Sequence, residues 1–468
     1  MLLSKVLRRV RGRVLWQART FAAAPSPWVR PLGEGALLLR FGNDISNDIN
    51  RNVLNHMRSL EKNRGNIHGV KEILPAFASL LVHYDPLEVT SAQIEEWCFS
   101  VSSGDDTETG NARTVHIPVC YGGEYGPDLT AAAEIAGLSA EDVVRLHSKA
   151  TYQVYFLGFT GGFPYLGGLP EELACVPRLS TPRQRVERGA IGIAAGQTGV
   201  YTLTSPGGWY LLGQTPKALF DPSQDPPALL KPGDSVKFVP LTDATEFEPE
   251  TVLPEENLLL EHPWIEIVSP GPMTSVQDVG REGYARHGVS KSGAADDLAL
   301  RTGNALLGNP DDVAGLEVAM GKLKIRALGS STIALTGADC GAKLTRSMFR
   351  GAPAESVCTN KIVSLQKGDE LELGVARDGA RAYLCVRGGV DVPRVLGSRS
   401  TDIKAKLGGH QGRILQVGDE LGRCQYAGDV SSVDLRAPYD PLREEDLAVD
   451  KREWVLRVLP GPGDPGTA

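Results

Sequence analysis

The sequence has few aromatic residues, 6% of its 468 positions, and no apolar run that approaches the roughly 20 residues of a membrane-spanning helix. Its seven cysteines include no C-x-x-C pair and no dense cluster, which favours free thiols in a reducing compartment over a disulfide framework. Glycine and proline are abundant instead, with 53 and 31 residues. This composition favours short strands and tight turns, and the length predicts about two to four domains.

Several well-known site motifs are also missing. The sequence contains no G-x-x-x-x-G-K-S/T nucleotide loop, no H-E-x-x-H zinc motif, no G-x-S-x-G nucleophile turn and no G-x-G-x-x-G between a strand and a helix. Any catalytic chemistry therefore requires a different arrangement of residues.

The net charge of −8 is unevenly distributed. Residues 1–33 carry seven basic side chains and no acidic one, and the apolar residues from Leu3 to Val14 recur at helical spacing. A cationic amphipathic helix of this kind is typical of transit peptides, so we expect residues 1–27 to direct the protein to the mitochondrion. If the stretch is only a basic tail, the protein is expected in the cytoplasm. The acidic remainder argues against nucleic acid as a partner.

The first part of the body mixes helix and strand patterns. Residues 28–110 predict a small α/β unit, with strands at Ala36–Phe41 and Ser79–Tyr84 and a helix at Ile45–Leu60. Residues 111–242 change to glycine-rich turns and short apolar runs, which predict a compact β-barrel.

Two short helices are predicted before the barrel strands. Asp128 can cap the first, which should end at Gly137, and Ser139 with Asp142 can cap the second, which should continue through His147.

An acidic, proline-containing stretch at residues 243–263 is the best candidate for a linker. A second β-rich region follows at residues 264–430. Residues 431–468 resemble the start of a further domain that is incomplete.

The first unusual motif is the glycine-rich segment Leu157–Leu169. Three later segments have a similar composition of glycine and small polar residues, namely Ser180–Arg183, Gly196–Tyr201 and Ser205–Trp209. Glycines let backbone N–H groups approach a ligand closely, so these donors and Arg183 could hold a phosphate or carboxylate. The pattern also fits the corners of a barrel with one surface arginine.

A second set of motifs consists of short polar loops in the later region. They are Ser275–Arg281, Gly288–Asp296, Leu307–Pro310, Leu335–Asp339, Arg387–Val390 and Gly397–Asp402. Asp278, Asp296, Asp339 and Asp402 each lie beside Gly, Ser or Thr, where a rigid scaffold can present a catalytic group. Aspartates in such positions also form purely structural turns.

The first set of motifs resembles the KipI-type family, which includes the B-type subunits of 5-oxoprolinase and allophanate hydrolase subunit 1-like domains. The second set resembles the KipA-type family, which includes the C-type subunits of 5-oxoprolinase and allophanate hydrolase subunit 2-like domains. Both are similar to parts of the carboxyltransferase of urea carboxylase. The resemblance covers nearly everything from Pro31 onward, so the chain is similar to a fusion of a B half and a C half.

The resemblance implies a β-rich α+β fold with a cyclophilin-like β-barrel in the B half, preceded by the small α/β unit, and related barrels in the C half. It also implies a component of an ATP-dependent amidohydrolase, 5-oxoprolinase, which opens 5-oxo-L-proline to L-glutamate together with a separate A-type subunit in a hetero-oligomer. ATP and Mg²⁺ are the cofactors that such chemistry requires.

On the same resemblance, candidate catalytic residues are Asp278, Asp296 and Arg183. Candidates for binding substrate or nucleotide are Gly161, Gly162, Tyr165, Gln197, Thr198, Ser292 and Arg399. Asp278 or Asp296 is a candidate for holding Mg²⁺, and no further metal ligand is assigned. Gly161 departs from the proline usual in the family, and the C family continues beyond the strand expected at Leu459–Pro462, so that the C half is expected to be incomplete.

Two other functions remain open. One is a carboxyltransferase for urea-type amides acting in trans, because this sequence has no Met-Lys-Met biotin-attachment site and no carboxylase module. The other is a regulatory binding protein, because relatives are known as histidine-kinase inhibitors.

Overall fold

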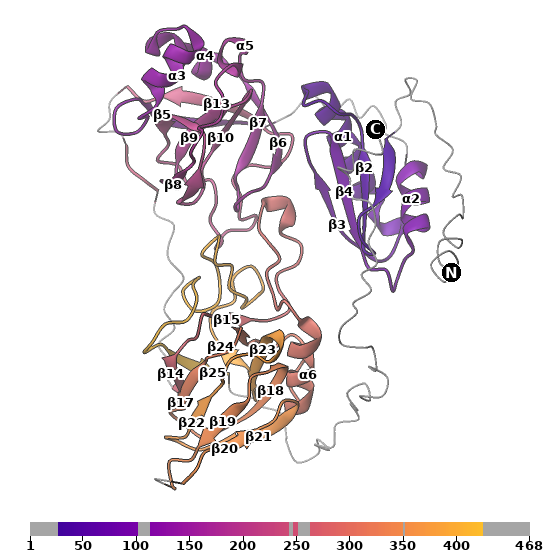
Figure 1. Cartoon of the computed structure of the whole chain (residues 1–468). Helices are drawn as coiled ribbons and strands as arrows, with labels where there is room; N and C mark the ends of the chain where they lie inside the picture. Colours follow the sequence, from indigo (N-terminus) through magenta and orange to yellow (C-terminus); the bar gives the residue numbers. More distant parts are fainter. Residues whose placement is uncertain (1–26, 102–112, 243–246, 251–262, 350–351, 425–468) are drawn as a thin grey trace, which may run out of the picture.

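The computed structural model describes residues 27–101, 113–242, 247–250, 263–349 and 352–424 (Figure 1). The expected transit peptide lies outside these residues except for its last position, and the expected incomplete domain at 431–468 lies wholly outside them. No helix in the described ranges is long and apolar enough to cross a membrane. All seven cysteines are described and none forms a disulfide.

The small α/β unit is a four-stranded antiparallel sheet in the order β1-β2-β4-β3, which shares one core with two helices. Its elements are β1 (Trp28–Pro31), β2 (Ala36–Arg40), α1 (Asn47–Lys62), β3 (Val70–Pro75), β4 (Ser79–Tyr84) and α2 (Ser91–Ser100). Alternate residues of the strands, such as Leu37, Leu39, Leu80 and Val82, are buried in that core. The predicted strands and helix are confirmed, with each end within two residues of its expected position.

The B half continues into a closed barrel of seven strands in the order β10-β7-β6-β13-β5-β12-β9. They are β5 (Thr114–Tyr121), β6 (Tyr152–Leu157), β7 (Pro164–Gly167), β9 (Ala190–Ala194), β10 (Gln197–Val200), β12 (Tyr210–Gln214) and β13 (Ser235–Pro240). β5 and β13 run parallel, and their neighbours pair antiparallel. A two-stranded sheet of β8 (Arg183–Val186) and β11 (Ser205–Gly207) lies outside the barrel order. The predicted barrel of the B half is therefore confirmed.

Two helices pack on the barrel through their apolar faces. α3 (Leu129–Ala136) ends at Gly137, which is left-handed, and α4 (Ala140–Lys149) begins after Ser139, whose side chain accepts the N–H of Asp142. These helix ends agree with the sequence. The expected cap by Asp128 is wrong, because its side chain makes no capping hydrogen bond.

The C half contains two sheets that share one large apolar core. The first has the order β20-β19-β22-β17-β14-β25-β24 and the second the order β15-β16-β23-β18-β21. The strands are β14 (Pro263–Ser269), β15 (Met273–Gln277), β16 (Gly315–Ala319), β17 (Lys324–Ala327), β18 (Ser331–Asp339), β19 (Ala342–Thr345), β20 (Glu355–Val357), β21 (Lys361–Leu365), β22 (Glu370–Glu372), β23 (Asp378–Val386), β24 (Val390–Asp391) and β25 (Glu420–Arg423).

The family resemblance implies a barrel for this region, and the described strands form two packed sheets instead. The inner faces of both sheets are buried against each other, so the core is complete without a closed ring of hydrogen bonds. Helix α6 (Asp297–Leu307) packs against the second sheet through Leu300 and Leu307, which cluster with Tyr383 and Cys385 of β23.

Candidate functional site at the seam between the halves

The glycine-rich loop 158–163 connects β6 to β7. Its backbone is left-handed at Phe159 (φ 67°) and at Gly162 (φ 72°). The Thr202 hydroxyl donates to the carbonyl of Gly161 at 2.6 Å and lies 3.1 Å from the Thr160 hydroxyl. The barrel therefore fixes this loop by buried hydrogen bonds.

Gly161 and Gly162 serve packing in this structure. A Cβ at Gly161 would lie 2.7 Å from the Phe220 ring, and one at Gly162 would lie 2.9 Å from the Cβ of Phe220. The Gly162 N–H, a candidate anion donor, instead donates to the carbonyl of His287 at 2.7 Å. In this arrangement the loop contacts the C half, and this N–H is already used.

We define the seam as loop 158–163 of the barrel together with residues 284–289 and 395–407 of the C half. Val289, Val395 and Leu407 are buried in one apolar cluster with barrel residues that include Leu157 and Phe220. The two halves thus share a continuous core.

Two polar contacts accompany this core. The Lys404 ammonium lies 4.5 Å from the centroid of the Phe159 ring, a distance typical of a cation–π contact. On the side of the α/β unit, the Ala285 N–H donates to the Glu72 carboxylate at 3.1 Å. The seam therefore connects the C half to both parts of the B half.

Asp278, a candidate catalytic acid, is 6% exposed and follows β15. One carboxylate oxygen accepts the hydroxyls of Ser398 and Ser400 at 2.6 and 2.5 Å and the N–H of Gly280 at 2.8 Å. The other oxygen accepts the N–H of Arg399 at 2.6 Å. Asp278 therefore acts as a clamp that holds the loop 397–402 in place.

Arg281 completes this clamp from the same motif. Its guanidinium, 2% exposed, donates to the carbonyls of Val395 and Ser400. Val395 belongs to the seam, so the clamp positions the surface that meets the barrel.

Arg399 and Ser292, two binding candidates, lie beside the clamp. The Arg399 side chain donates to the Val392 carbonyl at 2.8 Å and pairs with Asp391 at 3.3 Å. Ser292 has a left-handed backbone (φ 55°), and its carbonyl would be 2.8 Å from a Cβ at Gly280. The structure thus brings Asp278, Ser292 and Arg399 together, as the second set of motifs suggested.

Asp296 lies apart from this group, at the start of α6. Its carboxylate accepts the N–H of Ala299 at 3.0 Å, and its own N–H donates to the Tyr383 hydroxyl at 2.8 Å. This is an N-cap, which stabilises a helix by satisfying a free backbone donor. In the described residues Asp296 has a structural partner rather than a catalytic one.

Arg183 is held by an ion pair in the B half. Its guanidinium lies 2.6 Å from one oxygen of Asp128, and the other oxygen of Asp128 accepts the N–H of Leu211 at 2.8 Å. This pairing explains why Asp128 does not cap its helix. It also means that Arg183 is committed to an acidic partner, whereas the sequence suggests an exposed arginine available to an anion.

Thr198 is fully buried next to His147, which no functional motif of the sequence includes. The Thr198 hydroxyl donates to the Gly192 carbonyl at 3.1 Å and so accepts from Nε2 of His147 at 3.0 Å. The other ring nitrogen then accepts the Tyr121 hydroxyl at 2.7 Å. Burial lowers the pKa of His147 to about 3, which keeps the ring neutral. Thr198 thus takes part in a structural network.

Gln197 and Tyr165 are the candidates that retain free polar groups. Gln197 is half-buried in β10, and its amide has no hydrogen-bond partner among the described residues. Tyr165 in β7 stacks on Phe156, with ring centroids 4.4 Å apart and planes 17° apart. Burial raises the pKa of Tyr165, and the positive charge of Arg178, which is not among the residues that the sequence motifs pointed to, acts in the opposite direction. The sequence signal for it is local, because residues 176–188 contain four arginines and one acid.

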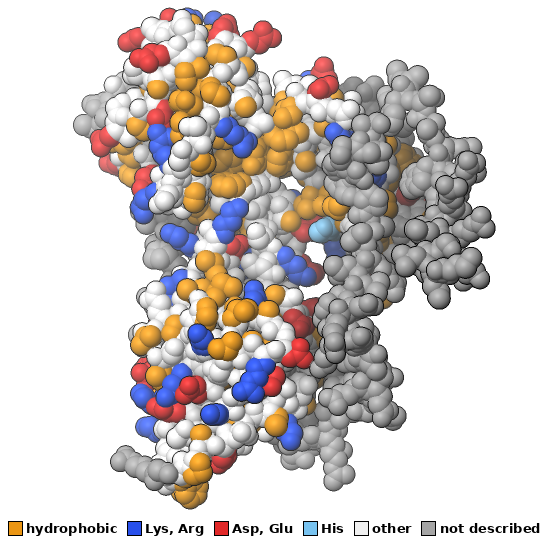
Figure 2. Space-filling model, in the orientation of Figure 1, with side chains coloured by type: hydrophobic (Ala, Val, Ile, Leu, Met, Phe, Trp, Pro, Cys, Tyr) orange, Lys and Arg blue, Asp and Glu red, His pale blue; other side chains and the backbone are white. Residues whose placement is uncertain are grey.

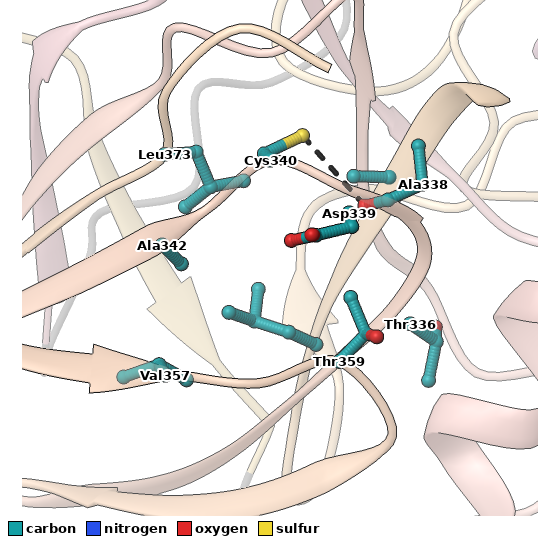
Figure 3. Close-up of a pocket in the computed structure, with 10 residues that line it drawn as sticks. Thr336, Ala338, Asp339, Cys340, Ala342, Val357, Thr359 and Leu373 are labelled. Carbon is teal, nitrogen blue, oxygen red and sulfur yellow. Dashed lines mark hydrogen bonds between the residues drawn. The ribbon is translucent and has the colours of Figure 1, made fainter. Parts of the chain in front are cut away.

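The Leu335–Asp339 motif lines a pocket in the C half of about 220 Å³ including its open mouth (Figure 3). The lining residues are Leu335, Thr336, Ala338, Asp339, Cys340, Ala342, Val357, Thr359, Leu373 and Ala382.

Two polar side chains of this pocket make local hydrogen bonds. The Thr336 hydroxyl donates to the Ala299 carbonyl at 2.7 Å, and Asp339 accepts the N–H of Gly341 at 2.8 Å. Burial, together with the charge of Asp339, raises the pKa of the Cys340 thiol. The pocket is therefore mainly apolar, and its thiol stays protonated at neutral pH.

A magnesium site was one expectation for the aspartates. Within the described ranges, no three His, Cys, Asp or Glu side chains are placed to hold a metal ion. Asp278 does not fit this role, because both its oxygens accept hydrogen bonds from the chain itself in a buried position. The structure therefore gives no reason to place a metal ion at Asp278.

Comparison with known proteins supports this architecture. The family model of the carboxyltransferase domain, subdomains C and D, matches residues 27–230, and the model for subdomains A and B matches residues 287–466. The 5-oxoprolinase B subunit of Bacillus subtilis (strain 168) is 42% identical over 229 residues, which are 46% of this chain and 93% of that protein.

The C half has its own relatives. The 5-oxoprolinase C subunit of Escherichia coli (strain K12) is 40% identical over 157 residues, which are 34% of this chain and 48% of that protein. The crystal structure of TTHA0988 matches with a TM-score of 0.70 and 34% identity, over 86% of this chain and 76% of that chain. One solved chain thus matches across both halves.

Fold and matches together define a carboxyltransferase-domain protein with both sets of subdomains on one chain. The chain belongs to the family of the B-type subunit of 5-oxoprolinase, and its C half is similar to part of the C-type subunit. It spans about half the length of the C-type relative.

Proposed function

We propose that this chain supplies the B and C components of an ATP-dependent 5-oxoprolinase and works with a separate A-type subunit in a hetero-oligomer. The reaction consumes 5-oxo-L-proline, ATP and water and releases L-glutamate, ADP and phosphate. The observation that carries the proposal is the seam, where the B-like and C-like halves share one apolar core and the motif Gly161-Gly162 meets His287 directly.

The chemistry explains why several components are needed. A lactam carbonyl is a poor electrophile, and transfer of the terminal phosphoryl group of ATP to its oxygen activates the carbonyl carbon toward water. Addition of water and cleavage of the C–N bond then open the ring to an acyl phosphate, and a second water releases glutamate and phosphate. Asp278 clamps a loop and Asp296 caps a helix, so we assign the nucleotide and Mg²⁺ to other parts of the complex. The contribution of this chain is to bind and position.

A coupled glutamate assay tests the proposal on the chain alone, on an A-type subunit alone and on their mixture. We expect glutamate only from the mixture, and only with ATP and Mg²⁺ present. A mixture without activity, made from two folded components, would contradict the proposal.

A second candidate follows from the family descriptions, which name a carboxyltransferase domain. In that case the chain would transfer a carboxyl group to a urea-type amide with a biotin carrier supplied in trans. Urea-dependent ATP consumption with a biotin carboxylase partner, and none with 5-oxoproline, would favour it. If neither partner elicits turnover and the chain inhibits a histidine kinase, the regulatory alternative replaces both.

We also propose a mitochondrial location, supported by the seven basic residues and absent acids of residues 1–33. A fusion of residues 1–35 to a fluorescent reporter should co-localise with mitochondria. A diffuse cytoplasmic signal would contradict this.

A further inference from the structure

The outward side of α2 in the α/β unit combines acidic and apolar side chains. Its buried residues pack in the core that the helix shares with the sheet. On the opposite side Glu95, Glu96 and Phe99 are exposed, and Phe99 follows the two glutamates by four and three residues, which places it beside both on a helix surface. The Phe99 side chain is 46% exposed, and Leu87, in the turn before α2, is 95% exposed. We call Glu95, Glu96 and Phe99 the α2 face.

Neither carboxylate of the α2 face is neutralised by its surroundings. In the part of the chain that the structure describes, Glu95 and Glu96 form no ion pair and accept no hydrogen bond through their side chains. On the neighbouring helix α1, by contrast, Glu61 pairs with Arg64 at 3.6 Å. Two adjacent unpaired carboxylates beside an exposed phenyl ring favour a partner that is both basic and apolar.

The sequence contains a segment of this complementary character in residues 1–26, which lie outside the described residues. Its apolar residues from Leu3 to Val14 recur at helical spacing. No acidic side chain accompanies them, and the basic ones are Lys5, Arg8, Arg9, Arg11, Arg13 and Arg19. The segment leads into β1, so it is joined to the same α/β unit that carries the α2 face.

The connection between the two is long enough for them to meet. Residues 15–26 can span up to about 40 Å, at about 3.3 Å per residue. A folded unit of the size of residues 27–101 has a radius of gyration of roughly 11 Å, so the segment can reach α2 from the start of β1. Because the segment is tethered, even a weak contact is populated.

Other exposed surfaces suit a cationic segment less well. Figure 2 shows apolar side chains gathered over the B-half barrel, with lysine and arginine side chains among them, and this positive charge repels a basic segment. Helix α5 (Glu171–Ala174) has two adjacent exposed acids, Glu171 and Glu172, but no aromatic residue. The α2 face thus combines unpaired acids with an exposed ring.

We propose that the basic segment of residues 1–26 binds the α2 face of its own chain, with its apolar side on Phe99 and its basic side chains on Glu95 and Glu96. In the chain as translated, this contact covers the exposed ring and keeps the cationic segment from other anionic surfaces. If the segment is also a transit peptide, its removal leaves the α2 face free for another partner. The inference does not depend on the proposed enzymatic function.

Trypsin digestion of the full chain tests the contact, because a bound segment is protected from cleavage within residues 5–19. The double variant Glu95→Gln/Glu96→Gln removes both charges and leaves every trypsin site in place. We expect this variant to be cleaved in the segment about threefold faster than the wild type, or more, at low salt. At about 0.5 M salt the two rates should approach each other, because screening weakens exposed charge pairs.

The matched control is Glu171→Gln/Glu172→Gln, which removes an equally exposed pair of acids on α5 and should be cleaved like the wild type. Phe99→Ser keeps both acids of the α2 face and removes the ring, so it should also be cleaved faster than the wild type. Equal urea midpoints for all variants would show that faster cleavage does not come from unfolding.

Carbodiimide cross-linking identifies the occupant of the α2 face. In a mixture of unlabelled chains and chains labelled with heavy nitrogen, we expect Lys5 to be linked to Glu95 or Glu96 of the same chain. Links between differently labelled chains would show that a second copy is the occupant and would overturn the proposal. Equal cleavage of the wild type and Glu95→Gln/Glu96→Gln at low salt would overturn it too, and faster cleavage of the α5 control alone would place the segment at α5 instead.

Discussion

Replacing Gly288 by alanine tests whether the two halves depend on close backbone contact at the seam. Gly288 has φ 77°, and a Cβ there would lie 2.7 Å from the Thr160 carbonyl oxygen and 3.0 Å from the Gly158 nitrogen. Gly283 is the matched control, because it has a similar φ of 86° and nothing within 4 Å of its would-be Cβ. The two positions therefore differ in their surroundings and not in their backbone conformation.

Both alanine variants place a Cβ on a left-handed backbone, which costs roughly 1–2 kcal/mol in either position. Gly288→Ala alone adds an overlap with two backbone atoms, and a backbone cannot turn aside as a side chain can. Overpacking of this kind typically costs a further amount of about 1–3 kcal/mol. We therefore expect Gly288→Ala to lose about 2–5 kcal/mol of unfolding free energy and Gly283→Ala no more than about 2 kcal/mol.

Urea unfolding at about pH 7.5, followed by tryptophan fluorescence, measures the loss for each variant. Limited trypsin digestion gives a local readout, because Lys404 contacts Phe159 across the seam and should be cut faster when the halves separate. Equal stability and equal cleavage at Lys404 in the two variants would refute the close contact at Gly288.

Three further predictions concern single side chains. Asp278→Ala removes an acceptor of hydrogen bonds from two hydroxyls and two backbone N–H groups. It should destabilise the C half by about 2–4 kcal/mol. An unchanged urea midpoint would contradict the role of Asp278 as a clamp. Because the folded pKa of His147 is about 3, below the unfolded value of 6.5, its contribution to stability is complete above pH 6.5 and is lost as the pH falls from there toward 3. Urea unfolding should show that the unfolding free energy falls by about 2 kcal/mol between about pH 7.5 and 5.0. This fall should be absent in His147→Gln and present in His116→Gln, which replaces an exposed histidine. Equal pH dependence of stability in the two variants would disprove the prediction. Arg183→Ala leaves Asp128 without its cation and should destabilise the barrel by about 1–3 kcal/mol, so normal stability with lost turnover would favour a catalytic role instead.

Local sequence signals predicted the α/β unit well. Alternating apolar residues in Ala36–Arg40 and Ser79–Tyr84 place one face of each strand in a core, and this depends only on neighbours along the chain. Gly137 and Ser139 likewise mark helix ends because their effect is confined to one turn.

Local sequence signals could not predict side-chain partners that are far apart in the chain. Asp128 has the residue type and position of a helix cap, yet its carboxylate pairs with Arg183, 55 residues later. Asp278 accepts a hydrogen bond from Ser398, which lies 120 residues later in the chain. A carboxylate beside glycine and serine looks the same in a sequence whether it clamps a loop or binds a ligand, so its role becomes visible only with its partners.

The glycines of loop 158–163 show the same ambiguity. The absence of a side chain permits close approach of a ligand, and it equally permits close approach of Phe220 and of the C half. The division of the C half into two sheets is also non-local, because it depends on which strand edges pair and not on the alternation within each strand.

Joining both halves in one chain changes how the seam can be tested. A covalent link converts association into an intramolecular event, with an effective concentration that can reach the order of millimolar. A seam of modest intrinsic strength would then remain closed in this chain, although it would open between separate subunits at micromolar concentration. A substitution such as Gly288→Ala should therefore leave the apparent mass of the protein unchanged while it loosens the contact of Lys404 with Phe159. Local protection at the seam, and not dissociation, is the property that reports on the contact between the halves.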